Sequence, residues 1–326
     1  MRTSFSESDM QTRPVLSSKR YLTLCGGVGG AKLALGLSRV LAPEQLTIVV
    51  NTGDDFEHLG LSICPDIDTV TYTLAGLVQP IHGWGRDAES FVALETVERL
   101  GGETWFQLGD KDIGLHLMRR MMLDEGNSLS AVTKHIACRL GIAHAIAPMT
   151  DGRVRTMVQT SAGLIPFQQY FVKERCAPVI TGIQYIGAAD APASSALTQA
   201  LADPDLAGIF LCPSNPYLSI DPILALPGVR QMLVDATAPV IAVAPIVRGA
   251  AIKGPTVKIM RELAIEPSAA AVALHYADFL DGYIIDPTDA LTVNGPRVIS
   301  CNIVMKSLDD KVALAHRCIS FSDELA

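Results

Sequence analysis

A glycine-rich turn between two short apolar runs is the feature that most constrains the fold of this chain. The first run, Tyr21–Cys25, leads into the stretch Gly26-Gly-Val-Gly-Gly-Ala-Lys32. A helical pattern over Ala31–Leu41 and a second apolar run, Leu46–Val50, follow. Strands this apolar are typical of parallel strands that are buried on both faces. We therefore expect an α/β fold, a Rossmann-like, doubly wound and mostly parallel sheet.

The rest of the chain interrupts this alternation and then resumes it. A mostly helical insertion over about 66–145 is predicted by apolar residues at helical spacing in Asp66–Leu77, Ala88–Leu100, Ile113–Glu125 and Ser128–Leu140. Alternating residues in Arg153–Gln159 and Leu164–Val172 predict a hairpin. Strands and helices then alternate, with strands expected at Leu206–Cys212, Pro239–Ala244, Gly282–Ile285 and Val298–Val304. We interpret 21–326 as one domain that follows a disordered leader at 1–20, which lacks an apolar secretory core.

Composition excludes several classes of function. The 326 residues are 49% hydrophobic and carry a formal net charge of -8, with no run of Lys and Arg. Such a chain is not expected to bind nucleic acid or an anionic membrane surface. Its longest apolar stretches are far below the ~20 residues that span a bilayer, so we expect a cytoplasmic protein. Seven cysteines without a C-x-x-C pair predict reduced thiols.

The glycine turn is a candidate phosphate site. Glycines let a backbone approach a ligand, and the free amides at a helix N-terminus bind phosphate, which makes Gly27, Gly29, Gly30 and Lys32 candidate binding residues. The stretch is neither a complete dinucleotide fingerprint, since Lys32 replaces the last glycine, nor a P-loop, since Leu33 follows the lysine. The alternative is a tight turn that binds no ligand.

Two acidic clusters follow the second predicted strand. Asp54 and Asp55 end the stretch Asn51-Thr-Gly-Asp-Asp, and Asp66 and Asp68 lie in Cys64-Pro-Asp-Ile-Asp-Thr. Carboxylates at the carboxyl end of a parallel strand face the crevice where α/β proteins bind ligands, and they suit Mg²⁺ that bridges a diphosphate. Asp54, Asp66 and Asp68 are therefore candidate Mg²⁺ ligands. The alternative for Asp66 and Asp68 is capping of the helix that starts at Pro65.

Four further segments carry groups that suit a ligand. Trp84 stands between two glycines and is placed to stack on a flat ring, or else it plugs its loop. Ser214 and Asn215 offer short polar groups in a proline-flanked turn after a strand. His58 lies between the acidic clusters, and Gly109–Asp112 precedes a helix, where capping is the alternative to ligand binding.

Together these motifs resemble one known family. They are Gly26–Lys32, Asn51–Asp55, Cys64–Thr69 with Tyr72–Leu74, Gly83–Gly85, Gly109–Asp112 and Pro213–Pro216. In this order and at this spacing they are similar to the 2-phospho-L-lactate transferases (CofD/FbiA) of coenzyme F-420 biosynthesis. The resemblance covers about residues 21–321, and six motifs are far more specific than one.

The resemblance implies a Mg²⁺-dependent transferase with a Rossmann-like fold. In this family the terminal ribityl hydroxyl of the deazaflavin Fo attacks the diphosphate of a guanosine-linked three-carbon acid, and GMP leaves. The product is F-420-0 or a close analogue that carries a 2-phospholactyl, phosphoenolpyruvyl or 3-phosphoglyceryl group. The resemblance also implies a homodimer and a functional link to a guanylyltransferase and a glutamate ligase.

Carried over by motif, the family's roles divide between the two substrates. On the donor side, Gly27–Lys32 would face the phosphates and the nucleoside, and Ser214 and Asn215 would line the nucleotide. Lys32 is the only cation among these residues.

The catalytic side of the resemblance rests on the acidic clusters and on Trp84. Asp54 with Asp66 and Asp68 would hold Mg²⁺, and Trp84 would border Fo. Asp54, Asp55 and Asp66 are the expected catalytic residues. A carboxylate such as Asp55 would accept the hydroxyl proton, although the sequence does not separate a base from a metal ligand.

Two other classes of function compete with the transferase. The gluconeogenesis-factor regulators share the glycine-loop fold and bind nucleotide sugars, but a Gly- and Ser-rich stretch follows their aspartate pair. Here Phe56-Glu-His-Leu follows Asp55, which favours the transferase. A redox flavoenzyme is disfavoured by the incomplete dinucleotide fingerprint.

Overall fold

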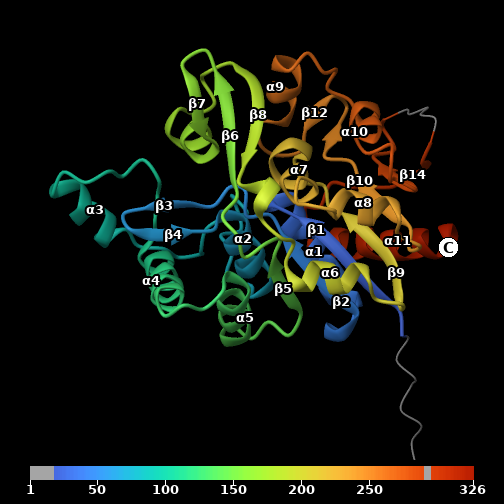
Figure 1. Ribbon diagram of the computed structural model, residues 1–326, viewed down its shortest axis with the longest axis horizontal. Coiled ribbons are helices and arrows are strands. Elements are labelled where there is room, and N and C mark those ends of the chain that lie inside the picture. The colour runs from blue at the N-terminus through green and yellow to red at the C-terminus, as the bar shows by residue number, and fades with distance from the viewer. Residues whose placement is uncertain (1–17, 290–294) are drawn as a thin grey trace, which may run out of the picture.

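Seven parallel strands form the central sheet of the computed structural model, which describes residues 18–289 and 295–326 (Figure 1). The strand order is β14-β13-β10-β9-β1-β2-β5. The strands are β1 (Arg20–Cys25), β2 (Leu46–Val50), β5 (Ala145–Pro148), β9 (Leu206–Leu211), β10 (Val240–Val243), β13 (Gly282–Ile285) and β14 (Arg297–Ser300). This sheet confirms the predicted α/β, doubly wound fold. Most of the predicted leader, residues 1–17, lies outside the described residues.

The strand order reverses between β1 and β9. From β1 the chain continues to β2 and β5 on one side, and it returns to β9, β10, β13 and β14 on the other. Leu22 of β1 therefore pairs with Thr47 on one side and with Ile209 on the other. In open α/β sheets ligands bind beyond the carboxyl ends of the strands at such a switch point. The residues that follow β1 and β9, Gly26 and Cys212, mark that place.

Helices cover both faces of the sheet. Helix α1 (Gly27–Val40) packs against α2 (Pro65–Leu74) and α11 (Leu308–Leu325). In Figure 1, α11 lies behind the sheet, whereas α6 (Ser195–Leu201) and α8 (Val229–Val234) lie in front of it. The remaining helices near the carboxyl edge are α7 (Asp221–Leu224), α9 (Thr256–Glu262) and α10 (Ala269–His275). Helix α1 begins four residues before the predicted start at Ala31, so the glycines form its first turn.

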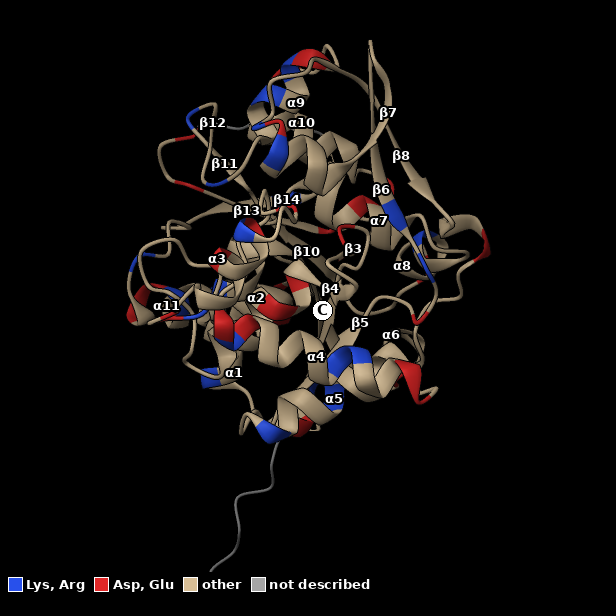
Figure 2. Cartoon of the chain, turned by 90° about the vertical axis from the view of Figure 1, so that its left-hand side faces the viewer, with Lys and Arg blue, Asp and Glu red and all other residues tan. Residues whose placement is uncertain are grey.

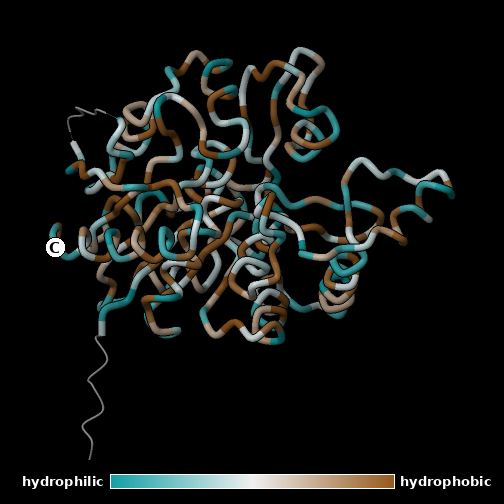
Figure 3. Tube along the Cα trace, turned by 180° about the vertical axis from the view of Figure 1, so that it is seen from behind, coloured by the Kyte–Doolittle hydropathy of each residue, from teal (hydrophilic) through white to brown (hydrophobic). Residues whose placement is uncertain are grey.

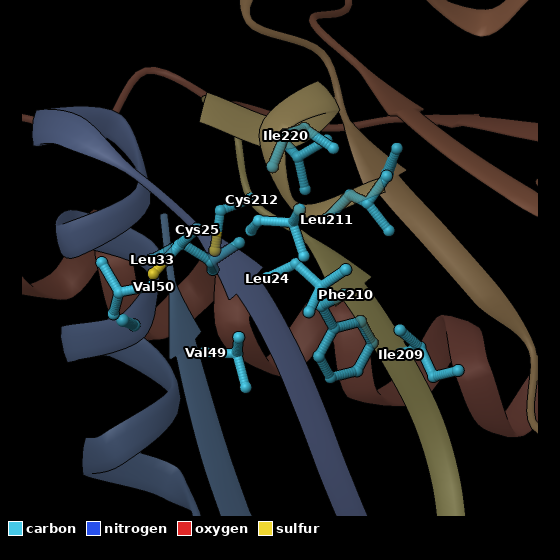
Figure 4. Close-up of a cluster of buried hydrophobic side chains, with 14 of the residues drawn as sticks. Leu24, Cys25, Leu33, Val49, Val50, Ile209, Phe210, Leu211, Cys212 and Ile220 are labelled. Atoms are coloured by element: carbon cyan, nitrogen blue, oxygen red, sulfur yellow. The ribbon is translucent and has the colours of Figure 1, made fainter. Parts of the chain in front are cut away.

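The core lies between the central strands and these helices. Side chains of Leu24, Val49 and Phe210 are fully buried there (Figure 4). Cys25 and Cys212 lie in the same cluster, and all seven cysteines are free thiols, as predicted. Figure 3 shows hydrophobic segments concentrated in the central part of the chain trace. Helix α1 approaches α11 so closely that a Cβ on Gly36 would clash with the carbonyl oxygen of Lys311.

An arm projects from the end of the sheet that carries β5 (Figure 1). We define the arm as β3 (Phe56–His58), β4 (Leu61–Ile63), α3 (Val92–Arg99) and α4 (Asp110–Asp124). A small apolar cluster of Leu61, Ile63 and Leu108 holds it together. Helix α5 (Leu129–Arg139) packs against β5. The four predicted helices thus correspond to α2–α5, but the antiparallel β3–β4 hairpin was not predicted because its strands are only three residues long.

A second antiparallel sheet follows the arm, in the order β7-β6-β8. Its strands are β6 (Arg155–Thr160), β7 (Gly163–Pro166) and β8 (Ile180–Ile186). The predicted hairpin is confirmed at β6 and β7, but its second strand ends at Pro166, and Gln169–Lys173 is helical. The strand expected at Val298–Val304 likewise ends at Ser300. Two-residue strands, β11 (Ile246–Val247) and β12 (Ala250–Ala251), pair near the same carboxyl edge.

The distribution of charged residues and the helices of the described residues agree with the composition. Acidic and basic segments alternate over the elements drawn in Figure 2. Among the described residues, no helix has both the length and the apolar character that a membrane crossing requires.

Candidate active site

The Ser214 hydroxyl links the end of β1 to the loop that follows β9. Ser214 Oγ accepts a hydrogen bond from the Gly26 amide (3.1 Å) and donates one to the Gly26 carbonyl (2.8 Å). The first turn of α1 lies directly on this junction, since a Cβ on Gly30 would lie 2.8 Å from Ser214 Oγ, and one on Gly29 would clash with the Pro213 carbonyl. Close packing at the switch point therefore requires both glycines, and it commits the Ser214 hydroxyl to the backbone.

Asp66 crosses from α2 to the glycine turn. Its Oδ1 accepts a hydrogen bond from the Gly27 amide (2.7 Å), and its Oδ2 accepts one from Asn51 Nδ2 (2.9 Å). Asn51 also donates to the Leu218 carbonyl (3.1 Å) and accepts from the Gly53 amide (2.8 Å). The side chain thus does not cap its own helix, whose N-cap residue Cys64 makes no side-chain cap bond. Asp66 ties together the turns that follow β1, β2 and β9.

Asp54 and Asp55 are buried with unused oxygens, and Asp54 lies beside Asp66. Asp54 is 6% exposed and Asp55 is 5% exposed. The Oδ1 atom of each has no hydrogen-bond partner among the described residues. Burial, reinforced by the neighbouring carboxylates of Asp66 and Asp55, holds the pKa of Asp54 well above its ordinary range. Burial also raises the pKa of Asp66 to about 6. An unpaired buried carboxylate is costly, so this site suits a cation.

The donor set fits a divalent cation that is shared with a ligand. The described part of the chain has no group of three or more His, Cys, Asp or Glu side chains arranged to hold a metal ion. Mg²⁺, however, usually takes only one or two protein carboxylates and completes its shell with water and substrate phosphates. Asp54 and Asp66 meet that requirement, because their carboxylates are neighbours and Asp66 lies against the Gly27 amide.

Asp55 differs from this pair. Burial raises its pKa to about 7, and the positive charge of Arg155 acts in the opposite direction. A carboxylate with a pKa near neutrality is suited to general base catalysis at physiological pH. What distinguishes Asp55 is its charged surroundings, since Arg155 and Arg119 act on it, whereas the charged neighbours that act on Asp54 are the carboxylates of Asp66 and Asp55.

Asp68 is committed to a different partner. Arg119 of α4 forms a two-pronged ion pair with it, through Nη2 to Oδ1 and through Nη1 to Oδ2 (3.1 Å). Both side chains are buried, and the ring of His116 lies 3.8 Å from Asp68 Oδ2. Burial lowers the pKa of His116 to about 4, so the ring is neutral. The structure therefore joins Asp54 and Asp66, whereas it directs the third candidate ligand, Asp68, to the arm.

Two of the predicted nucleotide-binding residues have structural partners. Asn215 Oδ1 accepts from the amides of Tyr217 (3.0 Å) and Leu218 (3.1 Å), and its Nδ2 donates to Thr256 Oγ1 (3.0 Å). Lys32 is half-buried, and its Nζ donates to the Met305 carbonyl (2.9 Å). Asn215 has thus used its amide oxygen and one of its two N–H donors, whereas the ammonium group of Lys32 retains two donors.

Trp84 lies beside the glycine turn. The Gly83 backbone sits on Val28 in the first turn of α1, since a Cβ on Gly83 would lie 2.8 Å from Val28 Cγ1. The indole is 50% exposed and stacks on His82, with the ring centroids 5.6 Å apart. The face of the indole that His82 does not cover is open to a planar ligand.

The other two candidate segments are explained by packing within the arm. His58 is buried in an aromatic cluster with Phe56 and Trp105, and its ring centroid lies 5.0 Å from that of Trp105. In the Gly109–Asp112 stretch, Asp110 accepts from the amides of Val92 and Ala93 at the start of α3. Capping is therefore the role that the structure gives to Asp110.

Three site residues were missed as functional residues. Asn51 was part of a motif but had no role, and its signal was its place at the end of a buried strand. Arg155 and Thr156 come from β6, and the Thr156 amide donates to the Gly53 carbonyl (2.6 Å). Their distance along the sequence from Asp54 left no signal, because only the tertiary fold places β6 beside the acidic cluster.

Comparison with known proteins identifies the family. The model of the family described as 2-phospho-L-lactate transferase CofD matches residues 22–304. The chain belongs to this family. It is 37% identical over 317 residues to a phosphoenolpyruvate transferase of Streptomyces griseus, covering 94% of this chain and 99% of that protein. It is 36% identical over 311 residues to a phosphoenolpyruvate transferase of Mycobacterium tuberculosis, covering 88% and 93%.

A solved structure of low sequence identity also supports the fold. A member of the UPF0052 family from Bacillus halodurans superposes with a TM-score of 0.61 and 14% sequence identity, covering 92% of this chain and 98% of that one. The chain is thus a member of a transferase family with an α/β fold that is shared beyond it.

Proposed function

We propose that this protein transfers a phospho-three-carbon-acid group from a guanosine diphosphate-linked donor to the ribityl hydroxyl of Fo. The reaction releases GMP and forms F-420-0 or a close analogue. The observation that carries the proposal is the buried Asp54–Asp66 pair at the switch point of a CofD family chain, where Asp66 accepts a hydrogen bond from the Gly27 amide. Relatives named phosphoenolpyruvate transferase make phosphoenolpyruvate the first acid to test, ahead of 2-phospholactate and 3-phosphoglycerate.

Asp54 and Asp66 would hold Mg²⁺ against the donor diphosphate. Bound there, the ion would neutralise charge on the transferred phosphoryl group. Asn51 and the Gly27 amide fix the orientation of Asp66, so that its carboxylate is positioned before the donor arrives. The glycine turn brings backbone amides close to the same phosphates.

Asp55 would act as the base for the acceptor. The ribityl hydroxyl of Fo attacks the phosphorus that carries the three-carbon acid, and the bond from that phosphorus to the GMP oxygen breaks. The hydroxyl proton passes to the Asp55 carboxylate, whose pKa of about 7 suits both its uptake and its later release. Trp84 would border the deazaflavin ring, on the side of the crevice that the His82–Gly85 loop forms.

The wider proposal follows the family. It includes a homodimer in the cytoplasm, a guanylyltransferase that supplies the donor, and a glutamate ligase that extends the product.

The test is a product analysis. The protein is incubated with Fo, GTP, Mg²⁺, a guanylyltransferase and one of the three acids, and the product is identified by mass. We expect a new Fo derivative with one acid, accompanied by an equal amount of GMP.

The matched control is Asp54→Asn, which keeps the size of the side chain but removes its charge. It should form the product about a thousandfold more slowly under the same conditions. If no acid gives a product with the unaltered protein, the transferase proposal is wrong. A regulator that binds nucleotide sugars then becomes the favoured function.

A further inference from the structure

Two strands of the β7-β6-β8 sheet each contact one of the loops that flank the switch point. Thr156 of β6 lies opposite Tyr185 of β8 in the strand register, and side chains in such a pair point to the same face of the sheet. The Thr156 amide donates to the Gly53 carbonyl in the loop after β2 (2.6 Å). The Tyr185 hydroxyl donates to the Tyr217 carbonyl in the loop after β9 (2.7 Å). This sheet therefore holds both loops at once.

Residues 217–222, which contain the acceptor of the Tyr185 hydrogen bond, reach Asp66 through one amide side chain. The Leu218 carbonyl accepts from Asn51 Nδ2 (3.1 Å), and the same amide group donates to Asp66 Oδ2 (2.9 Å). A shift of residues 217–222 would thus move Asn51 and, with it, the carboxylate of Asp66.

Asp54 is held between the same two parts of the chain. Its neighbour Gly53 lies against both, since a Cβ on Gly53 would lie 2.5 Å from Thr156 Oγ1 and 3.0 Å from Pro222 Cβ. Glycine permits this close approach because it has no side chain. The loop after β2 is therefore enclosed between β6 and α7, and the separation of these two elements decides where Asp54 lies.

Asp221 ties residues 217–222 to Tyr185 and to α10. Its Oδ2 lies 3.4 Å from the Tyr185 hydroxyl, and His275 Nε2 lies 2.8 Å from its Oδ1 and 3.0 Å from its Oδ2. A carboxylate only accepts, so the imidazole donates to it. Burial, together with the charges of Asp221 and Asp54, raises the pKa of Tyr185, and the hydroxyl therefore keeps the proton that it donates to Tyr217.

We propose that Tyr185 is a positioning residue for the Asp54–Asp66 pair. Its hydroxyl fixes residues 217–222 against the loop after β2, and Asn51 passes that position on to Asp66. Tyr185 acts through these neighbours and needs no contact with a substrate. The inference rests on the proposed function, in which the pair holds Mg²⁺ against the donor.

Tyr185→Phe tests the proposal, because it removes the hydroxyl and keeps the ring. Mn²⁺ replaces Mg²⁺ in the binding measurement, since its paramagnetic resonance signal reports the free ion directly. We expect Mn²⁺ to bind about three- to tenfold more weakly, the range set by loss of one hydrogen bond. The Mg²⁺ concentration that gives half of the maximal transfer rate should rise by the same factor, whereas the KM for Fo should stay within about twofold.

Tyr283→Phe is the matched control. Tyr283 is also buried, on β13, but its hydroxyl has no hydrogen-bond partner among the described residues. This variant should leave the Mn²⁺ affinity within about twofold of the unaltered protein. An equal loss of Mn²⁺ affinity in both variants would overturn the proposal, as would an unchanged affinity in Tyr185→Phe.

Hydrogen exchange separates positioning from a general loss of stability. In Tyr185→Phe, amides of residues 51–55 and 217–221 should exchange faster, while those of β10 and β13 keep their rates. Faster exchange over the whole chain would show a merely structural role and overturn the proposal. If Mn²⁺ binding depends on Tyr185 but the unaltered protein transfers no acid, the proposed function fails and the positioning role remains. If the unaltered protein transfers an acid without binding Mn²⁺, the positioning role fails instead.

Discussion

Two aspartates of one helix have opposite surroundings. Asp66 and Asp68 lie two residues apart at the start of α2, and each is 6% exposed. Asp68 forms an ion pair with Arg119, whereas Asp66 has only amide donors and lies beside the carboxylate of Asp54. Burial of charge without a counterion destabilises a fold, and burial of a well-made ion pair is close to neutral. Asp68 thus joins α2 to the arm through its ion pair with Arg119. Asp66, beside a second carboxylate, has surroundings that suit a cation.

The largest expected effect is on catalysis. Asp54→Asn or Asp66→Asn should lower the rate of transfer by about a thousandfold, because each removes a charge that acts on the reacting phosphate. The melting temperature of Asp54→Asn should stay the same or rise, since the repulsion between two buried carboxylates is relieved. That of Asp66→Asn should fall, because an amide side chain can accept only one of the two hydrogen bonds that Gly27 and Asn51 donate to Asp66. Turnover numbers and thermal unfolding are measured on the same preparations. Full turnover by either variant at saturating Mg²⁺ would show that these residues are not metal ligands.

The opposite result is expected on the other side of the helix. Asp68→Asn leaves the Arg119 guanidinium buried without its counterion, which should lower the free energy of unfolding by about 3–5 kcal/mol. Chemical denaturation measures this loss. The double variant Asp68→Asn, Arg119→Met serves as the control, because it removes both charges and should recover part of the stability. Normal stability combined with lost activity in Asp68→Asn would instead place Asp68 among the metal ligands.

Competition between protons and Mg²⁺ for the buried carboxylates gives a third expected effect. The pKa of Asp66 is about 6 in the folded protein, and it is near 3.9 when unfolded. Between these values the folded state binds more protons than the unfolded state, so stability falls as the pH rises through this range. Mg²⁺ binds the deprotonated carboxylates and should offset that loss. The rise in melting temperature on adding Mg²⁺ should therefore be several degrees larger at about pH 8 than at about pH 5.

Asp66→Asn is the control for this pH dependence. The variant cannot lose a proton at residue 66, so most of the pH-dependent gain from Mg²⁺ should disappear. A gain that is equal at both pH values in the unaltered protein would contradict a metal site built on these carboxylates.

The contrast between Asp66 and Asp68 also marks how far sequence reasoning reaches. Apolar runs and turn residues predicted the parallel sheet and placed Gly26, Asn51 and Ser214 at strand ends, because these patterns are local. The same local view treated Asp66 and Asp68 alike. What separates them is Arg119, which lies 51 residues further along the chain and reaches Asp68 only through the folded arm.

Other differences have the same origin. The glycine turn was expected to precede its helix, but close packing on Pro213 draws the glycines into the first turn of α1. Asn215 was expected to line the nucleotide, and the fold adds that its side chain caps the next helical turn and contacts Thr256. Residue types and spacing fix which groups are available, whereas long-range contacts decide which of them remain free to bind a ligand.

The smallest expected effect concerns Trp84, whose free face is open while His82 covers the other. Trp84→Ala should raise the KM for Fo by about three- to tenfold, the range expected for loss of one aromatic stacking contact. The KM for the donor should change less, because the loop meets α1 through the Gly83 backbone and not through the indole. Trp84→Phe keeps a flat ring and should restore most of the Fo affinity. Equal changes in both KM values would mean that the indole only stabilises the loop, and the acceptor ring would then have to stack elsewhere.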